Sequence, residues 1–190
     1  TGVIGEPMAD DRLTAALPGL QSKLNDDWAA AARAIMTTDT YPKAVTRTAK
    51  IDGVEVRLQG IIKGSGMIQP DMATMLGFIF TDAAVAAPAL QTLLTKYTPR
   101  TFNSITVDSD TSTSDTIILF ATAKAAHAPV ADAGDKRLSG FRRALEAVMR
   151  DLALLVVKDG EGVERLVTID VTGAASERTA RKIGLAVANS

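Results

Sequence analysis

The chain has 190 residues, a formal net charge of −1 and no cysteine. The lack of cysteine excludes disulfides, a thiol nucleophile and thiolate metal sites, and the interspersed acidic and basic residues give no basic surface for nucleic acid or an anionic membrane. Apolar residues make up 46% of the sequence and aromatic residues 4%, which predicts one sizeable domain with an aliphatic core, and no apolar run reaches membrane-spanning length.

The first part of the chain predicts two helices and a polar loop. Leucines and alanines recur at helical spacing over residues 10–20, and Ser22 is a candidate cap for a second helix that reaches about Met36. The segment 37–43 has the sequence Thr-Thr-Asp-Thr-Tyr-Pro-Lys, which indicates a loop whose side chains bond to their own backbone.

Three strands are predicted next. The runs 45–51 and 54–62 flank Asp52-Gly53, a strong signal for a two-residue turn, and therefore predict a hairpin. The hairpin leads to Lys63, which would ordinarily be a strand-end cation that reaches solvent. After a glycine-containing loop, the nearly apolar run 74–81 predicts a buried strand.

The second half of the chain predicts alternating helices and strands. The first two are a helix over 86–97 and a brief strand over 104–107. Next comes a helix that Ser114 or Asp115 caps, that includes the apolar run 117–120 and that ends within the Ala-rich stretch 121–134, where a surface loop follows. The last three are a long helix over 135–158, a strand over 165–172 and a helix from Ser176 to Ala188. The basic residues of the last helix are expected to face solvent.

Residues 108–116 consist only of Asp, Ser and Thr. Such a run is compatible with a flexible linker or with a metal loop built from carboxylate and hydroxyl oxygens. It lacks the glycine and the terminal glutamate of a Ca²⁺ loop.

The single histidine, His127, lies in a loop beside Ala and Pro and is predicted to be an ordinary surface residue. A Ser-His-Asp triad or a His-ligated metal would have to use this one side chain. The scarcity of imidazole therefore favours a mechanism whose base is an amine.

Thr74 opens the apolar run 74–81, and two interpretations of it are open. Threonine is β-branched and common in strands, so it needs no function there. Alternatively its hydroxyl attacks the carbonyl of Ala73, and hydrolysis of the resulting ester leaves Thr74 as a new N-terminus. Its free α-amine, with a reference pKa near ~7.7–8.0, would then act as its own general base.

Resemblance to a known family favours the second interpretation. The run from Lys63 through Met72-Ala73-Thr74-Met75-Leu76 resembles the self-cleavage segment of the ornithine acetyltransferase family, the glutamate N-acetyltransferases of arginine biosynthesis. Four more segments resemble motifs of that family, in the same order along the chain: 1–5, 37–40, 108–116 and 158–162. The resemblance covers essentially the whole chain.

The resemblance implies roles for particular residues. Cleavage falls between Ala73 and Thr74, and Thr74 becomes the nucleophile. Thr1 and Gly2 form an oxyanion hole. Lys63 takes part in substrate binding and catalysis.

Two further residues are implied to bind the substrate. Thr40 contacts the amino acid, and Glu161, otherwise a solvated turn acid, binds the amino group of ornithine, a sensible charge-assisted contact. The run 108–116 is implied to be an ordered polar turn that supports the site without metal.

The implied fold is a layered α/β sandwich of the type shared with D-aminopeptidases. The implied reaction moves an acetyl group from N-acetylornithine to glutamate through acetyl-Thr74, without metal or bound cofactor. Some family members also use acetyl-CoA as donor. Two α and two β chains form the implied cytoplasmic heterotetramer, and neither nucleic acid nor membrane is an expected partner.

The chain is expected to be the central portion of a longer precursor, with residues 1–73 ending the α chain and 74–190 beginning the β chain. Two alternatives remain at this point. One is a Thr-nucleophile aminopeptidase or amidase of the same fold, in which water takes the acyl group. The other is an uncleaved, non-catalytic interaction domain.

Overall fold

The computed structural model describes residues 7–66, 68, 75–109 and 115–190. Four residues of the expected site, Thr1, Gly2, Ala73 and Thr74, lie outside the described residues. The other residues of the expected site, Thr40, Lys63 and Glu161, lie within the described part of the chain.

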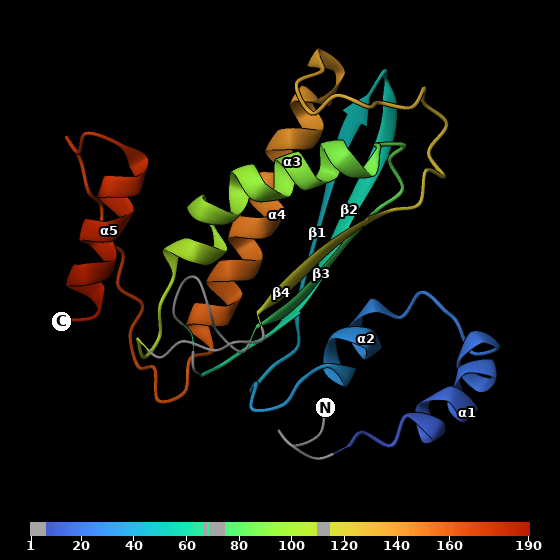
Figure 1. The fold of residues 1–190 in the computed structure, drawn as a ribbon, viewed down its shortest axis with the longest axis horizontal. Coiled ribbons are helices and arrows are strands. Elements are labelled where there is room, and N and C mark those ends of the chain that lie inside the picture. Colours follow the sequence, from blue (N-terminus) through green and yellow to red (C-terminus); the bar gives the residue numbers. More distant parts are fainter. Residues whose placement is uncertain (1–6, 67, 69–74, 110–114) are drawn as a thin grey trace.

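The described residues form a mixed α/β structure with a four-stranded sheet packed against helices (Figure 1). The strands are β1 (Lys43–Ile51), β2 (Val54–Lys63), β3 (Leu76–Thr81) and β4 (Thr116–Ala121). The helices are α1 (Asp10–Gln21), α2 (Trp28–Ala34), α3 (Ala87–Tyr97), α4 (Ser139–Lys158) and α5 (Glu177–Ala188), with short 3₁₀ turns at η1 (Thr98–Arg100), η2 (Phe102–Ser104) and η3 (Lys136–Leu138).

The predicted hairpin is confirmed. Strands β1 and β2 pair antiparallel from Ile51 opposite Val54 to Lys43 opposite Ile62. Asp52 and Gly53 both have positive φ, 51° and 79°, as a two-residue hairpin turn requires. The hairpin therefore brings Lys43, at the start of β1, beside the end of β2 that leads into Lys63.

Strand β3 lies between β2, which is antiparallel to it, and β4, which is parallel. The helix predicted from the run 117–120 into 121–134 is wrong, because 117–120 belongs to β4 and no helix follows it before η3. Isoleucine and phenylalanine fit a pleated sheet well, and this preference prevailed over the capping signal of Asp115. Among the described residues, β3 begins at Leu76, two positions after the predicted start at Thr74.

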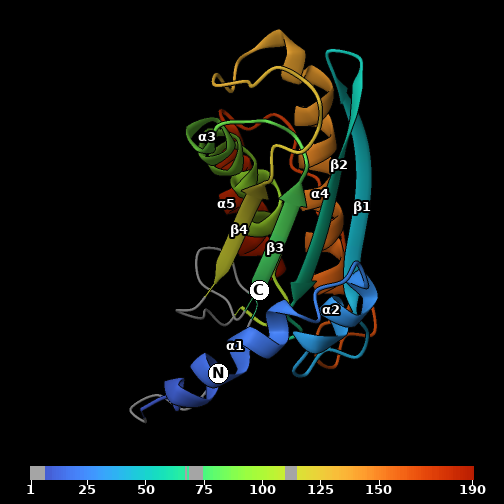
Figure 2. The same ribbon diagram turned by 90° about the vertical axis from the view of Figure 1, so that its right-hand side faces the viewer.

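Helices α3 and α4 cover one face of the sheet (Figures 1 and 2). The long helix predicted over 135–158 is confirmed as η3 and α4, and its fully buried side chains include Phe141, Met149 and Leu152. A Cβ on Gly60 of β2 would come within 2.6 Å of Leu152 Cδ1. Glycine at this position lets α4 approach β2 closely, which helps to fix where the C-terminal end of α4 lies.

The other face of the sheet is partly covered by α2. Its first residue, Trp28, packs against Phe80 of β3 with ring centroids 5.2 Å apart, and Phe80 stacks on Phe120 of β4 at 5.0 Å. This helix is shorter than predicted, because Asp27 rather than Ser22 caps it by accepting from Ala30 N–H at 2.8 Å.

Helix α1 has the predicted position but buries none of its residues. It projects beyond the end of the sheet, and its leucines, Leu13, Leu17 and Leu20, are each more than half exposed (Figure 2). The helical spacing of its leucines predicted the helix correctly, but it did not predict whether those leucines pack against this sheet.

Two predicted strands are wrong. Ser104 ends η2, and the residues that follow it up to Val107 form no strand. The segment 165–172 alternates apolar and polar residues, yet no described strand pairs with it. Alternation indicates a strand only where a neighbour supplies the hydrogen bonds.

Helix α5 begins as predicted, with Ser176 Oγ accepting from Thr179 N–H at 3.1 Å. The expectation that its basic residues face solvent holds for Arg178 and Lys182 but not for Arg181, which is half-buried and donates to Pro99 O at 3.1 Å. None of the described helices has the length and apolarity needed to cross a membrane.

Candidate functional site

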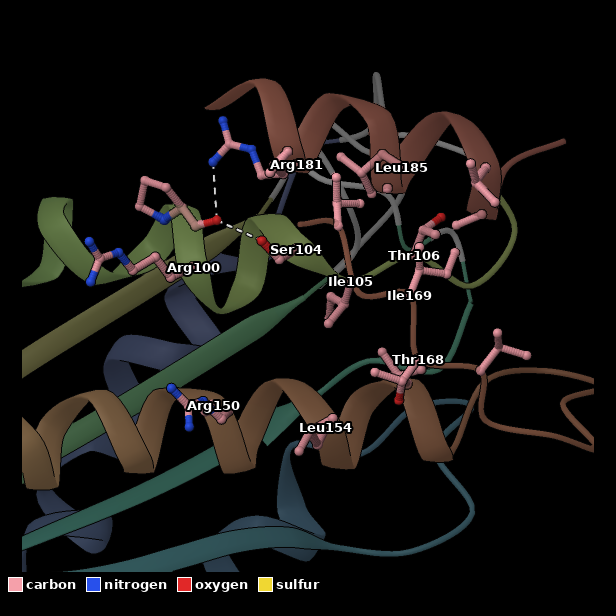
Figure 3. A pocket seen from close by; sticks show the side chains of 18 of the residues that line it. Arg100, Ser104, Ile105, Thr106, Arg150, Leu154, Thr168, Ile169, Arg181 and Leu185 are labelled. Carbon is pink, nitrogen blue, oxygen red and sulfur yellow. Dashed lines mark hydrogen bonds between the residues drawn. The ribbon is translucent and has the colours of Figure 1, made fainter. Parts of the chain in front are cut away.

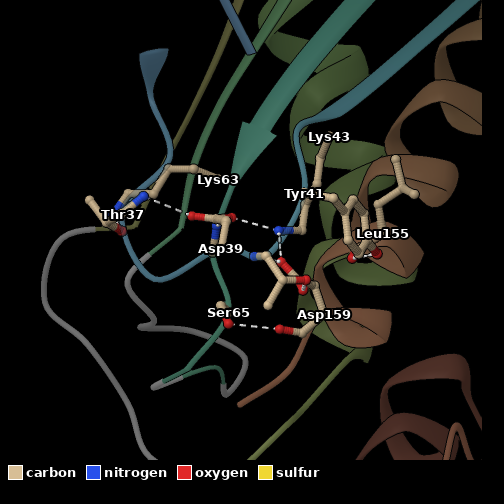
Figure 4. A network of polar contacts seen from close by, with 10 residues as sticks. Thr37, Asp39, Tyr41, Lys43, Lys63, Ser65, Leu155 and Asp159 are labelled. Carbon is tan, nitrogen blue, oxygen red and sulfur yellow. Dashed lines mark hydrogen bonds and ion pairs between the residues drawn. The ribbon is translucent and has the colours of Figure 1, made fainter. Parts of the chain in front are cut away.

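Three segments that are distant in the sequence meet at one end of the sheet. They are the loop 37–43, the end of β2 with the residues that follow it, 63–66, and the turn 159–161 after α4 (Figure 4). Each segment belongs to a motif on which the family resemblance depends. The structure therefore shows that these motif segments lie next to one another, which the sequence alone could not show.

Lys43 joins these segments from a fully buried position. Its side-chain exposure is 0%, and its Nζ lies 2.5 Å from Asp39 Oδ1 and 2.5 Å from Asp159 Oδ2, both of which are also buried. A buried lysine requires paired and hydrogen-bonded counterions, and two carboxylates provide them here. We call Asp39, Lys43 and Asp159 the buried triad.

Asp39 connects the triad to the end of β2. Its carboxylate accepts from Gly64 N–H at 2.8 Å and from Thr37 N–H at 3.1 Å, in addition to Lys43. Burial raises the pKa of Asp39, but the hydrogen bonds from Gly64, Lys43 and Thr37 together outweigh it and leave the pKa below its ordinary value.

Asp159 connects the triad to Thr40, one of the expected substrate contacts. Its carboxylate accepts from Thr40 N–H at 2.9 Å and from the Thr40 hydroxyl in a short hydrogen bond. Burial raises the pKa of Asp159, but the hydrogen bonds from Lys43 and Thr40 together outweigh this effect, so the pKa lies below its ordinary value.

Lys63 is the second buried lysine of the site. It ends β2, is 8% exposed, and its Nζ donates to Thr37 Oγ1 at 3.3 Å. Within the described residues, no carboxylate lies within 4.0 Å of this ammonium group. The ordinary interpretation of Lys63 as a cation in solvent is therefore wrong, and no carboxylate of the described residues forms an ion pair with it.

Glu161 lies across the loop that follows β2. Its N–H donates to Ser65 O at 2.8 Å, and Ser65 Oγ donates to Asp159 O at 2.7 Å, so the two turns are tied together. A Cβ on Gly66 would lie 2.8 Å from Glu161 Cδ. Glycine at position 66 is thus what allows the carboxylate of Glu161 to lie directly over this loop.

The structure brings together three of the expected site residues, Thr40, Lys63 and Glu161. The other expected residues lie outside the described part of the chain. The sequence interpretation missed the triad, whose members are Asp39, Lys43 and Asp159. Its acids lay within recognised motifs, but no spacing rule signals a contact between residues 43 and 159.

The triad predicts a loss of stability in acid. Both folded-state pKa values are lowered, so the stabilisation is complete above the unfolded pKa of about 3.9 and is lost as the pH falls through the folded values. We expect the free energy of unfolding of wild type to fall below about pH 4 more steeply than that of Asp39→Asn. Urea titrations at several pH values between neutrality and pH 3 measure this difference, and parallel pH profiles would contradict it.

The structure corrects the prediction for His127. The residue is 9% exposed, and its Nε2 accepts from Ala84 N–H at 3.0 Å, while its Nδ1 lies 2.9 Å from Ala128 O and donates to it. The imidazole therefore links its own loop to the segment that follows β3, and it is buried as a structural contact. In the described residues, no group of three or more His, Asp and Glu side chains is arranged to hold a metal.

A groove of about 1270 Å³ lies elsewhere, between α4, α5 and the segments 96–107 and 163–171 (Figure 3). Its lining combines aliphatic side chains with charged ones of both signs, and it includes none of Thr40, Lys63 and Glu161. The chemical groups of the candidate site therefore do not belong to this groove.

Comparison with known proteins gives a consistent set of relatives. Residues 1–190 match the sequence model of the ArgJ family. The chain is 57% identical over 191 residues to the arginine biosynthesis bifunctional protein ArgJ of Caulobacter vibrioides. It is 57% identical over 194 residues to that of Mesorhizobium japonicum and 56% identical over 194 to that of Rhizobium meliloti. Each alignment covers 100% of this chain and 47% of the relative, so the chain spans about half the length of the curated relatives it matches.

Proposed function

Because the chain belongs to the ArgJ family, we propose that the full-length protein is a glutamate N-acetyltransferase of arginine biosynthesis. Its relatives are named bifunctional proteins of that pathway. The donor in this proposal is N-acetylornithine and the acceptor is glutamate. Acetyl-CoA is an additional donor if the second function of the relatives is retained.

The proposed nucleophile is made by self-cleavage between Ala73 and Thr74. Residues 1–73 then end one chain and 74–190 begin the other. Thr74 Oγ attacks the acetyl carbonyl of N-acetylornithine while the α-amine of Thr74 takes the hydroxyl proton. Thr1 and Gly2 stabilise the oxyanion of the tetrahedral intermediate. Ornithine leaves with a proton from the amine, and glutamate then attacks the acetyl ester.

The observation that carries the proposal is the contrast between the two buried lysines. Lys43 is neutralised by two carboxylates, whereas Lys63 has a hydroxyl partner and no carboxylate among the described residues. A buried cation is costly unless it is paired, so an anionic ligand is the fitting complement. Both proposed amino-acid substrates carry a carboxylate.

Glu161 and Thr40 supply complementary groups. The Glu161 carboxylate lies against Gly66 beside the loop that follows Lys63, where it suits the ammonium group of ornithine. The Thr40 hydroxyl donates to Asp159, which leaves its oxygen lone pairs to accept from a substrate donor. Lys63 and Glu161 together would bind an amino acid by its two opposite charges.

The proposal also covers the fold type, the assembly and location, and the domain organisation of the protein. The four-stranded sheet and its covering helices are compatible with the layered sandwich of the D-aminopeptidase type. A heterotetramer of two α and two β chains and a cytoplasmic location are part of the proposed function in arginine biosynthesis. The chain described here is then a single domain, the central portion of that enzyme.

The test uses the full-length protein and its Thr74→Ala variant. Intact mass spectrometry should find two fragments that divide between Ala73 and Thr74 in wild type and one uncleaved chain in the variant. Wild type supplied with N-acetylornithine and glutamate should produce ornithine and N-acetylglutamate in equal amounts.

The other outcomes identify the alternatives. Release of free acetate with no N-acetylglutamate would indicate a hydrolase of the aminopeptidase or amidase type. An uncleaved wild-type chain without acyl transfer would overturn the proposal and favour the interaction domain. Repeating the assay with acetyl-CoA as donor decides whether the protein has the second activity.

A further inference from the structure

The segment that contains the proposed cleavage site is preceded by a doubly anchored residue, Ile68. Its N–H donates to Asp108 Oδ1 at 3.0 Å, and its carbonyl accepts from Val107 N–H at 2.8 Å. Ile68 is 1% exposed and belongs to the hydrophobic core. Both polar groups of its backbone are thus held by one short stretch, 107–108.

The residue that follows the segment, Met75, is anchored in the same way. Its N–H donates to Asp115 Oδ1 at 2.7 Å, and its carbonyl accepts from Thr116 N–H at 2.9 Å. Met75 is 5% exposed and also belongs to the core. The parallel pairing of β3 with β4 begins directly after it, with Leu76 opposite Thr116.

These contacts have a common pattern. At each end an aspartate carboxylate accepts from the backbone N–H, and a backbone N–H next to that aspartate donates to the carbonyl. The two aspartates, Asp108 and Asp115, belong to the polar run 108–116. They are exposed, unlike the backbone groups that they hold. The described ends of the run, at Asp108 and Asp115, therefore hold the residues on either side of the segment between Ile68 and Met75.

We propose that Asp108 and Asp115 are positioning residues for self-cleavage at the Ala73–Thr74 bond, an inference that rests on the proposed function. Met75 N–H belongs to the planar peptide group that joins Met75 to Thr74. Asp115 therefore restrains the peptide adjacent to the nucleophile, and Asp108 restrains the opposite end of the segment. Neither aspartate exchanges a proton with the reacting atoms in this scheme.

The step that they assist is an N-to-O acyl shift followed by hydrolysis. Thr74 Oγ bonds to the carbonyl carbon of Ala73, the C–N bond to Thr74 breaks, and the hydroxyl proton passes to the departing amine. Water then cleaves the ester, which restores the Thr74 hydroxyl and leaves a carboxylate on Ala73. The reaction depends on attack geometry, so small displacements of the chain ends slow it strongly.

The experiment follows cleavage of the full-length protein after synthesis in a cell-free system, by intact mass against time. Asp115→Ala, which removes the acceptor, should cleave at least about tenfold more slowly than wild type. Asp115→Asn, whose amide oxygen can still accept from Met75 N–H, should retain most of the wild-type rate. Asp108→Ala should be slowed in the same direction.

Asp132→Ala is the matched control, because Asp132 is an exposed aspartate that accepts from a backbone N–H, that of Gly134, at 2.8 Å in a distant loop. It should cleave at the wild-type rate. Equal rates for wild type and Asp115→Ala would overturn the positioning role and leave the proposed function standing. A wild type that never cleaves would instead overturn both.

Amide hydrogen exchange provides a readout that does not need cleavage. In the uncleaved Thr74→Ala protein, the Met75 amide should be protected, and addition of Asp115→Ala should raise its exchange rate at least about tenfold while core amides of α4 stay unchanged. An unchanged Met75 exchange rate would show that the contact does not restrain this peptide.

Discussion

Replacing Lys43 by methionine should lower the free energy of unfolding by about 3–5 kcal/mol. The substitution removes the cation from two buried carboxylates, each 2.5 Å from its Nζ, and leaves both charges in a low-dielectric environment. Methionine fills a similar volume, so packing is largely retained and the effect reports the lost charge. Urea denaturation of the full-length protein at neutral pH measures the change.

Two comparisons isolate the cause. Lys50→Met, on the exposed side of the same strand, should change the free energy of unfolding by no more than about 0.5 kcal/mol. The triple variant Asp39→Asn, Lys43→Met, Asp159→Asn should recover much of the loss, because the neutral amides can still accept from backbone N–H groups. Failure of the triple variant to recover would indicate that the lysine stem, rather than its charge, provides the stability.

The sequence was a good guide where local physics determines structure. The Asp52-Gly53 hairpin, the core-facing pattern of α4 and the Ser176 cap depend on neighbours a few residues away, and all three are confirmed. The helix predicted for the run 117–120 is wrong because a polar residue before an apolar run begins a strand as easily as a helix. Its pairing with β3, some forty positions earlier, decided the outcome.

The residues of the candidate site were predicted only in part, and from family resemblance rather than from local sequence patterns. Resemblance identified the segments that carry Thr40, Lys63 and Glu161, but it could not show that a lysine joins them. The sequence places Lys43 at the end of the polar loop 37–43, and lysine is almost never fully buried unless it is paired, so nothing in this segment indicates its burial. Its partner Asp159 is 116 positions away in the sequence, and the periodicity of a helix or strand cannot predict a contact over such a separation.

We expect the two buried lysines of the site to have different roles: Lys43 stabilises the fold, and Lys63 binds the substrate. Lys43 holds the loop 37–43 against the turn after α4, which sets where Thr40 and Glu161 lie relative to β2. Lys63 lies beside this framework and donates to Thr37, a member of the same loop. Substitution of the first should therefore act mainly on folding, and substitution of the second mainly on the reaction.

Lys63→Met should lower kcat/KM for acetyl transfer by about 30-fold or more, the equivalent of losing at least ~2 kcal/mol from a desolvated charge pair with the substrate carboxylate. Its effect on stability should be much smaller than that of Lys43→Met, because among the described residues it leaves no carboxylate without its cation. Steady-state assays with N-acetylornithine and glutamate, alongside urea denaturation of the same preparations, measure both quantities.

Lys63→Arg refines the interpretation. It keeps the charge but changes the donor geometry, so it should retain more substrate affinity than Lys63→Met. A rise in KM alone would assign Lys63 to binding, whereas a fall in kcat as well would assign it to the transition state too. If Lys63→Met destabilised the protein as much as Lys43→Met while leaving kcat/KM unchanged, Lys63 would be a structural residue, and the observation that carries the proposed function would be lost.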